Sequence, residues 1–387
     1  MKRLRVAIVA DFTEEGWPSM DLVADMLYER LCAEHASAVT AELIRPPLRR
    51  RASRLRGKVA FNVDRALNRF WDYPRYLSRQ TGRFDVFHIV DHSYAQLVRS
   101  LPAARTLVTC HDLDAFRSVL QPAFEPRSVP YRMMTRRILD GLRQAGHIAC
   151  DTEATRDALV QHAGIPPERT TVVLNGPHPS CTPHWEAAAE AEATRLVGRG
   201  QGVDLLHVGS TIDRKRIDTL LHVFASLRRD FPGARLIRVG GPMTAEQRRL
   251  ARDLGVEPSI LSVPFLDRAT LAAIYRHSAV LLLTSDREGF GLPALEALAC
   301  GTPVVASDIP ALREVGGDAV TYCSVDYVEE WRERVTGLLL ERQQQPEAWA
   351  RRKAAGVGRA AAFSWSRYAA DVVPLYYRLA AAETAGA

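Results

Sequence analysis

The chain has 387 residues, of which 47% are hydrophobic, and its formal net charge is +6 at pH 7. This length exceeds the ~300 residues that one compact core usually supports, so two domains are expected. The six cysteines are scattered and form no closely spaced pair, so neither a disulfide framework nor a zinc site is indicated. No stretch approaches the ~20 apolar residues of a membrane span, so we expect a soluble, cytoplasmic protein.

Short apolar runs alternate with helical patterns in the first half of the chain. The runs predicted as strands are residues 6–10, 86–90, 106–110 and 147–150, and the first amphipathic helix is predicted at residues 19–32. Strands that alternate with helices indicate a parallel sheet covered on both faces. An N-terminal Rossmann-like domain is therefore expected over residues 1–178, and the alternation then breaks in a linker at 179–201.

The alternation resumes after the linker and predicts a second domain over residues 202–362. Its predicted strands are residues 203–208, 234–239, 259–263, 280–284 and 303–307, and its predicted helices are residues 217–229, 244–254 and 270–277, a stretch after Pro293, and a long helical region from Val328. A last helix is expected at residues 363–387. The fold class is thus α/β, with two facing, doubly wound parallel-sheet domains. Ligands bind such sheets beyond the carboxyl ends of the strands, which predicts an interdomain cleft.

Two carboxylates follow the predicted strand at 280–284 in the stretch SDREGFGLPALEALACGTP. Glu288 lies in a glycine-flanked loop, and Glu296 lies about one turn inside the helix that Pro293 begins. The backbone N–H groups of residues 290–292 stand at the start of this helix, where the helix dipole favours negative charge. The stretch therefore predicts a diphosphate site beside two carboxylates that accept hydrogen bonds from sugar hydroxyls.

This stretch resembles the glutamate-x7-glutamate signature of family 4 glycosyltransferases, which are retaining enzymes of the two-domain GT-B architecture. The resemblance extends over most of the chain. It includes TCHDLDAF at 109–116, the end of the first domain at 150–178, HVGSTIDRKRIDTLLHVFASL at 207–227 and the closing helix at 363–379. These segments are specific for the superfamily and say little about the substrate.

The resemblance implies a role for each residue of the donor site. Glu288 would contact the donor sugar, Glu296 would hold the ribose hydroxyls, and Lys215 and Arg214 would hold the diphosphate. The segment lining the sugar and diphosphate would comprise Gly289, Phe290, Gly291 and Leu292. The family often has an arginine directly after the glycine that ends the first donor-domain strand, but here Ser210 follows Gly209. This departure leaves more of the leaving-group work to Lys215 and Arg214, with Arg216 as a helper.

Fixed cations explain why no metal ion or other cofactor is expected. Cleavage of a glycosyl–phosphate bond builds negative charge on the departing diphosphate, and cations placed there lower the barrier. His111, at the end of the strand 106–110, would assist near the donor sugar and complete a catalytic set with Lys215 and Glu288. Asp112 and Asp114 form a D-x-D tripeptide, the metal motif of another glycosyltransferase fold, which we interpret as a coincidence.

Further contacts are expected from three loops. Gly16 suits a close approach of the first loop to the donor, and Trp17 is a candidate for stacking on the acceptor, with Asp112 as a second acceptor contact. Phe265 and Leu266 follow the strand 259–263 and are expected to hold the base, whether uracil or guanine.

Residues 45–80 resemble the family least. Eleven basic residues against Asp64 and Asp72 give this stretch a charge of +9, with five aromatic residues interleaved. Such a composition fits an anionic membrane surface, an anionic acceptor or nucleic acid, and a solvated arginine-rich helix pair fits it equally well. We expect no nucleic acid partner, and a peripheral position at the inner face of the membrane is open.

The leading hypothesis is a retaining glycosyltransferase that moves a sugar from a UDP- or GDP-linked donor to an acceptor hydroxyl. The acceptor would be a glycan, a lipid-linked compound or a small molecule, in polysaccharide, glycolipid or secondary-metabolite synthesis. Two alternatives remain from the sequence. One is a sugar-nucleotide epimerase or phosphorylase on the same fold, and the other is a basic membrane- or nucleic-acid-binding protein with a degenerate site.

Overall fold

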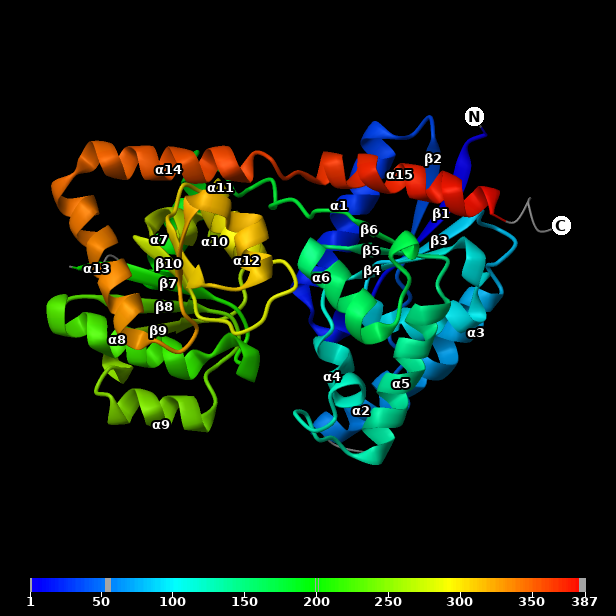
Figure 1. Cartoon of the computed structure of the whole chain (residues 1–387), viewed down its shortest axis with the longest axis horizontal. Coiled ribbons are helices and arrows are strands. Elements are labelled where there is room, and N and C mark those ends of the chain that lie inside the picture. Colours follow the sequence, from blue (N-terminus) through cyan, green and yellow to red (C-terminus); the bar gives the residue numbers. More distant parts are fainter. Residues whose placement is uncertain (1, 53–56, 199, 201, 383–387) are drawn as a thin grey trace. The chain divides into compact units, whose positions relative to one another are not determined.

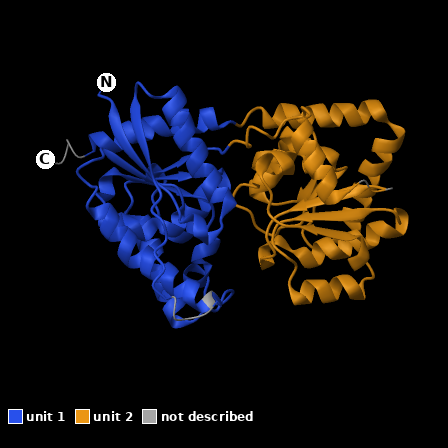
Figure 2. Cartoon of the chain, turned by 180° about the vertical axis from the view of Figure 1, so that it is seen from behind, with its two compact units in different colours: residues 1–175, 364–387 blue, residues 176–363 orange. Residues whose placement is uncertain are grey.

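A computed structural model describes residues 2–52, 57–198, 200 and 202–382. The chain forms two compact units, shown in Figure 2, and each is described by itself. Unit 1 comprises Met1–Asn175 together with Ser364–Ala387, and unit 2 comprises Gly176–Phe363. The expected linker at 179–201 lies within unit 2, where its helix α7 (Ala187–Val197) packs against α10 (Arg268–His277).

Unit 1 contains a six-stranded parallel sheet in the order β2-β1-β3-β4-β5-β6. Its strands are β1 (Leu4–Val9), β2 (Val39–Ile44), β3 (Val86–Ile89), β4 (Thr106–Cys110), β5 (His147–Cys150) and β6 (Thr170–Val172). The chain leaves β1 toward one edge of the sheet and returns to its other side at β3. The carboxyl ends of β1 and β3 therefore form the switch point at which doubly wound sheets bind ligands.

Unit 2 repeats this arrangement with the strand order β12-β11-β10-β7-β8-β9. Its strands are β7 (Asp204–Val208), β8 (Arg235–Val239), β9 (Ile260–Val263), β10 (Val280–Leu283), β11 (Val304–Ser307) and β12 (Val320–Cys323). The switch point of this sheet lies between β7 and β10, so the loops after these two strands are neighbours in space. These are the loops that carry Lys215 and Glu288.

Helices cover both faces of each sheet (Figure 1). Those not yet bounded are α1 (Pro18–Glu34), α2 (Gly57–Leu67), α3 (Tyr73–Ser78), α4 (Arg117–Leu120), α5 (Val129–Gln144), α6 (Glu153–Ala158), α8 (Ile217–Asp230), α9 (Ala245–Asp253), α11 (Leu292–Ala299), α12 (Pro310–Gly316), α13 (Val328–Gln344), α14 (Pro346–Ala360) and α15 (Trp365–Ala381). Every residue of β3, β4, β5, β10 and β11 is buried, as a sheet covered on two faces requires. The predicted two-domain α/β fold class is confirmed.

Helix α15 belongs to unit 1 and completes its core. The hydroxyl of Tyr376 lies 2.8 Å from Nδ1 of His88, whose Nε2 lies 2.8 Å from Oγ1 of Thr109. The hydroxyl of Tyr368 is 3.2 Å from the same Thr109 oxygen. Burial lowers the pKa of His88 to about 3, so this histidine is neutral. The helix thus satisfies polar groups that the strands β3 and β4 bury.

The stretch 45–80 forms a helical segment in which a π-turn, η2 (Asn68–Asp72), joins α2 to α3. The arginines of this stretch do not all act as free surface charge, because several of them lie against carboxylates of unit 1. The side chain of Arg69 is 12% exposed and reaches Glu15, Arg51 pairs with Asp72, and Arg45 lies near two aspartates of α1. Arg54 and Arg56 lie outside the described residues.

The aromatic residues of this stretch also divide into two groups. Tyr73 is 1% exposed and donates to the carbonyls of Ala10 and Ile44, while Phe61 and Phe70 pack against the core. Trp71 and Tyr76 point outward. None of the described helices is both long and apolar enough to cross a membrane.

Candidate functional site

The loop after β7 folds back toward Gly209, its first residue. Gly209 begins the loop, and the 3-10 turn Asp213–Lys215 ends in Arg216, a non-glycine residue in the left-handed region at φ 46°. This strained conformation is held by Thr284 at the end of β10, whose hydroxyl donates to the carbonyls of Lys215 and Arg216 at 3.0 and 3.1 Å. The turn therefore directs the side chain of Lys215 back under Gly209.

Lys215 and Arg214 meet Glu288 from the loop after β10. The Lys215 ammonium donates to Oε1 of Glu288 at 2.5 Å, and Nη1 of Arg214 donates to Oε2 at 2.8 Å. The hydroxyl of Ser285 donates to Oε1 at 2.6 Å. Burial opposes the charge of the Glu288 carboxylate, but the two cations and these hydrogen bonds lower its pKa to about 2. The predicted residues Arg214, Lys215 and Glu288 are thus brought together.

The same loop leads into helix α11. Gly291 precedes the helix at φ 94°, a conformation that favours glycine, and a Cβ at this position would also force the end of the Leu312 side chain to shift. Gly289 and Phe290 are buried, whereas Leu292 is half-buried at the first position of the helix. The predicted donor segment therefore opens a helix with its backbone N–H groups at the carboxyl edge of the sheet.

Glu296 has its own polar surroundings one turn along α11. The hydroxyl of Tyr275 donates to Oε2 of Glu296 at 3.0 Å, and Nη1 of Arg268 lies 3.5 Å from Oε1. Glu296 is 3% exposed, and burial raises its pKa although Arg268 and Tyr275 act in the opposite direction. Neither partner was identified from the sequence. Both come from α10, whose position in the fold a linear pattern does not reveal.

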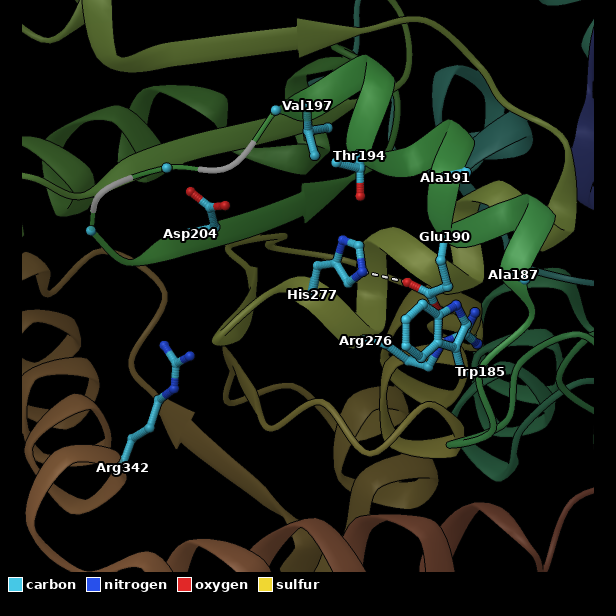
Figure 3. Close-up of a pocket in the computed structure, with 13 residues that line it drawn as sticks. Trp185, Ala187, Glu190, Ala191, Thr194, Val197, Asp204, Arg276, His277 and Arg342 are labelled. Carbon is cyan, nitrogen blue, oxygen red and sulfur yellow. Dashed lines mark hydrogen bonds and ion pairs between the residues drawn. The ribbon is translucent and has the colours of Figure 1, made fainter.

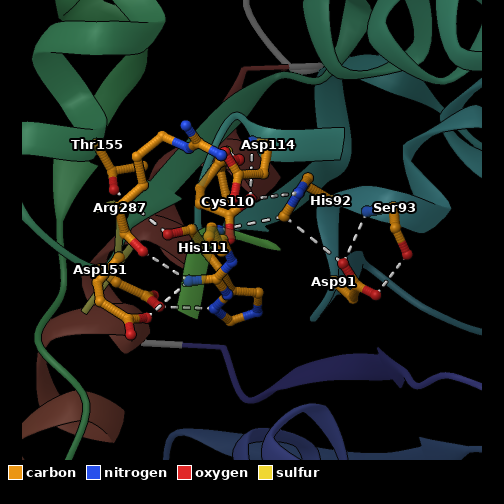
Figure 4. Close-up of polar contacts among 12 residues, drawn as sticks. Asp91, His92, Ser93, Cys110, His111, Asp114, Asp151, Thr155 and Arg287 are labelled. Carbon is orange, nitrogen blue, oxygen red and sulfur yellow. Dashed lines mark hydrogen bonds and ion pairs between the residues drawn. The ribbon is translucent and has the colours of Figure 1, made fainter. Parts of the chain in front are cut away.

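His111 lies in unit 1 at the carboxyl end of β4, as predicted (Figure 4). Its Nδ1 is 2.7 Å from Oδ2 of Asp151 and its Nε2 is 2.7 Å from the carbonyl oxygen of Val90. Both partners are acceptors, so both ring nitrogens donate and the ring is an imidazolium. Burial opposes this charge, but the carboxylate of Asp151 prevails and raises the pKa of His111 to about 9. His111 therefore contributes a fixed positive charge with both nitrogens engaged.

The other candidates in unit 1 lie around the ends of β1, β3 and β4. Gly16 closes the first loop at φ 70°, and Trp17 next to it is 48% exposed. Oδ1 of Asp112 accepts from the backbone N–H of Asp114 at 3.0 Å and lies 3.7 Å from Nε2 of His92. Among the residues that the structure describes, no group of three or more His, Cys, Asp or Glu side chains is arranged to hold a metal ion.

Three predicted donor residues stand apart from the charged cluster in unit 2. Ser210 is half-buried and follows Gly209, Phe265 is exposed after β9, and Leu266 next to it is half-buried. The structure shows no interaction that would mark these residues as a site. Their roles stay predictions.

A separate pocket in unit 2 is lined by Trp185, Glu190, Asp204, Arg276 and His277 (Figure 3). Asp204 is the first residue of β7 and His277 is the last of α10, so the pocket lies at the amino ends of the strands. Glu190 is already paired with both Arg276 and His277. Because doubly wound sheets bind ligands at the opposite edge, this pocket is not the candidate site.

Two doubly wound units with a cation–carboxylate cluster at a switch point define the GT-B class of glycosyltransferases. A family model described as "Glycosyl transferases group 1" matches residues 196–355, and one described as "Glycosyltransferase Family 4" matches residues 23–180. A D-inositol 3-phosphate glycosyltransferase from Frankia alni is 31% identical over 314 residues, covering 77% of this chain and 75% of that protein. Another from Geodermatophilus obscurus is 34% identical over 261 residues, covering 63% of this chain and 55% of that protein.

Solved structures agree on the fold. Sucrose-phosphate synthase from Thermosynechococcus elongatus has a TM-score of 0.76 at 21% identity, covering 98% of this chain and 100% of that one. WaaG, a glycosyltransferase of lipopolysaccharide biosynthesis, has a TM-score of 0.70 at 16% identity, covering 96% of this chain and 99% of that one. The chain belongs to family 4 of the glycosyltransferases and is a retaining enzyme that uses a nucleotide sugar. The transferase hypothesis is thereby confirmed over the epimerase, phosphorylase and binding-protein alternatives.

Proposed function

We propose that this enzyme transfers a hexose from a UDP-linked donor, with Lys215 and Arg214 holding the diphosphate. The observation that carries the proposal is the meeting of these two cations with Glu288 at the switch point between β7 and β10. A glycosyl–phosphate bond that breaks here would leave its negative charge beside fixed cations. Glu296, one turn into α11, would accept hydrogen bonds from the ribose hydroxyls.

The choice of UDP rests on similar proteins. A structure of Anabaena HepE in complex with UDP and glucose has the same fold, with a TM-score of 0.71 at 15% identity. The test is a thermal-shift screen of UDP- and GDP-linked sugars, in which a ligand at about 100 times its dissociation constant stabilises the protein by about 2.7 kcal/mol. A shift with GDP-sugars alone would show that the donor base is guanine and not uracil. No shift with any nucleotide sugar would contradict the proposed donor site.

We propose that the acceptor is a small polyol carrying a phosphate group. The support comes from the relatives, which are D-inositol 3-phosphate glycosyltransferases. Transfer of radiolabelled sugar to inositol phosphate, compared with free inositol and with lipid-linked acceptors, tests this assignment. Transfer to inositol or to a lipid-linked acceptor alone would contradict the phosphate requirement.

The reaction is proposed to need no metal ion. The supporting argument is positional, because Lys215 and Arg214 stand where the diphosphate charge would develop. Transfer is expected to continue in EDTA at the rate measured with magnesium or manganese. Loss of transfer in EDTA with recovery on adding manganese would instead assign a metal-binding role, for which Asp112 and Asp114 would be the first candidates.

A membrane-facing surface is proposed for the α2–η2 segment. Val59, Val63, Leu67 and Trp71 recur every four residues along it and are all exposed. Arg49 and Arg50 are exposed just before the segment in sequence, and the guanidinium of Arg75 lies over the ring of Trp71. An exposed apolar row with cationic neighbours suits the interface of an anionic bilayer better than a purely solvated helix.

A further inference from the structure

Arg238 is a buried cation in unit 2 that lacks a counter-ion. It interrupts the apolar strand β8, and its side chain is 0% exposed. Nη1 donates to the carbonyl of Gly241 at 2.6 Å, Nη2 lies 3.1 Å from the carbonyl of Gly209, and Nε has no partner. No carboxylate among the described residues pairs with it. Because burying an unpaired charge is costly, such a residue calls for an explanation beyond packing.

The position of Arg238 connects it to the proposed diphosphate site. Strand β8 lies beside β7, with Arg238 in register with His207, and Gly209 starts the loop that carries Lys215. A Cβ on Gly209 would lie 3.5 Å from both the His207 ring and Cε of Lys215, so these side chains share the space beneath this glycine. A Cβ on Gly240 would lie 2.2 Å from the Gly209 carbonyl oxygen, which shows how closely the two strand ends approach.

The positively charged groups around Gly209 differ in whether a carboxylate neutralises them. Lys215 is neutralised by Glu288, which Arg214 also contacts. Burial, with Arg238 and Lys215 nearby, lowers the pKa of His207 to about 3, so His207 is neutral. Burial lowers the pKa of Arg238 only to about 10, so its charge persists at neutral pH. The loop itself begins with an uncharged side chain, Ser210.

We propose that Arg238 is a positioning residue for the nucleotide diphosphate, which fixes the glycine-rich ends of β7 and β8 and supplies an unneutralised positive charge beneath them. The inference rests on the proposed function, because it requires a diphosphate at the end of β7. Arg238 is enclosed and does not contact the donor. Its charge acts through a few ångströms of buried protein, where electrostatic screening is weaker than in water.

The experiment compares UDP with uridine by isothermal titration calorimetry, because only UDP carries the diphosphate. Arg238→Met is expected to weaken UDP binding on the order of tenfold while uridine binding changes less than about twofold. The matched control is Arg235→Met on the same strand, whose charge is neutralised by Asp204 at 2.8 Å. This control is expected to leave the preference for UDP over uridine unchanged.

A second variant separates charge from shape. Ser210→Arg places a cation at the start of the same loop and is expected to restore much of the UDP affinity lost in Arg238→Met. If Arg238→Met does not fold, Arg238→Lys keeps the charge and is expected to retain the preference for UDP within about threefold. A folded Arg238→Lys protein that loses this preference would contradict the inference.

The outcomes also distinguish the inference from the function on which it rests. A wild-type chain that binds neither UDP nor GDP would overturn both. If GDP is the ligand, GDP and guanosine replace UDP and uridine in the comparison. If the wild type binds the diphosphate and Arg238→Met weakens nucleoside and nucleotide equally, or neither, the proposed function stands and the role of Arg238 is overturned.

Discussion

The Lys215 ammonium group lies 2.5 Å from the Glu288 carboxylate, although 73 residues separate them in the chain. Lys215→Ala is expected to lower kcat, because the lysine charge matters most as the diphosphate departs. Glu288 keeps Arg214 and Ser285 as partners in this variant, so the fold should persist. Loss of one charged hydrogen bond, about 1.5–3 kcal/mol, corresponds to roughly a ten- to hundredfold effect.

The two carboxylates are expected to respond differently from the lysine. Glu296→Gln should act mainly on donor KM, since a ribose contact exists in ground and transition states alike, and Glu288→Gln should change both kcat and KM. Steady-state kinetics with circular dichroism measures this, and Lys353→Ala on the exposed face of α14 is the control. Full turnover in both the Lys215 and Glu288 variants would remove the chemical basis of the proposed site.

Tyr275 should set the pH range over which Glu296 binds the donor. Burial raises the pKa of Glu296, while Arg268 and the hydrogen bond from Tyr275 oppose that rise. Tyr275→Phe removes one opposing contact, so the pKa of Glu296 should rise further. As the pH is lowered, donor affinity should therefore begin to fall at a higher pH in this variant than in the wild type. The pH profile of donor KM measures this. A parallel profile with KM raised equally at every pH would indicate a packing role for Tyr275 instead.

Deprotonation of His111 should lower the free energy of unfolding in alkaline solution. Its pKa is about 9 in the folded chain against 6.5 for an unperturbed histidine, so the folded state binds the extra proton. The resulting stabilisation, about 3 kcal/mol, is complete below pH 6.5 and is lost as the pH rises through 9. Urea unfolding at pH 6, 7.5 and 9.5 should show a steeper decline for the wild type than for Asp151→Asn. Equal slopes would mean that His111 is neutral in the folded state.

The exposed row on α2 and η2 should bind anionic vesicles. Trp71→Ser is expected to weaken cosedimentation with phosphatidylglycerol vesicles, whereas Trp185→Ser, which removes an even more exposed tryptophan from unit 2, should not. Arg49→Ser with Arg50→Ser should weaken binding mainly at low salt, because exposed charges are screened over about 8 Å at physiological ionic strength. Donor hydrolysis should be unchanged in all three proteins, and unchanged vesicle binding in the Trp71 variant would contradict the surface.

The sequence predicted those parts of the fold that local patterns determine. Continuous apolar runs such as Val280–Leu283 identified the buried central strands. Three edge strands, β2, β6 and β12, escaped prediction, because partial exposure mixes polar residues into short segments, whereas the edge strand β9 was predicted. The charge count over residues 45–80 could not show that Arg69 is largely enclosed and paired with Glu15, since a linear count cannot separate an enclosed arginine from a solvated one.

The sequence predicted the candidate-site residues that lie within the family motifs, but it did not predict the partners of these residues elsewhere in the chain. Lys215 and Glu288 were both found, but their direct pairing depends on β7 and β10 being neighbours in the sheet. Asp151 and Tyr275 were missed because each acts on a partner distant in sequence. Arg238 could have been singled out from the sequence, since a charged residue directly after the apolar residues Leu236 and Ile237 is unusual in a central strand.

The membership of α15 in unit 1 has a consequence for biosynthesis. Unit 2 is continuous from Gly176 to Phe363, whereas unit 1 needs residues from both sides of it. During translation the second unit is therefore complete before the first. Until α15 is synthesised, His88 and Thr109 in unit 1 lack the tyrosine hydroxyls that contact them in the finished structure. A nascent chain thus carries an unfinished amino-terminal unit through most of its synthesis, so chaperone contacts and proteolytic sensitivity should concentrate there.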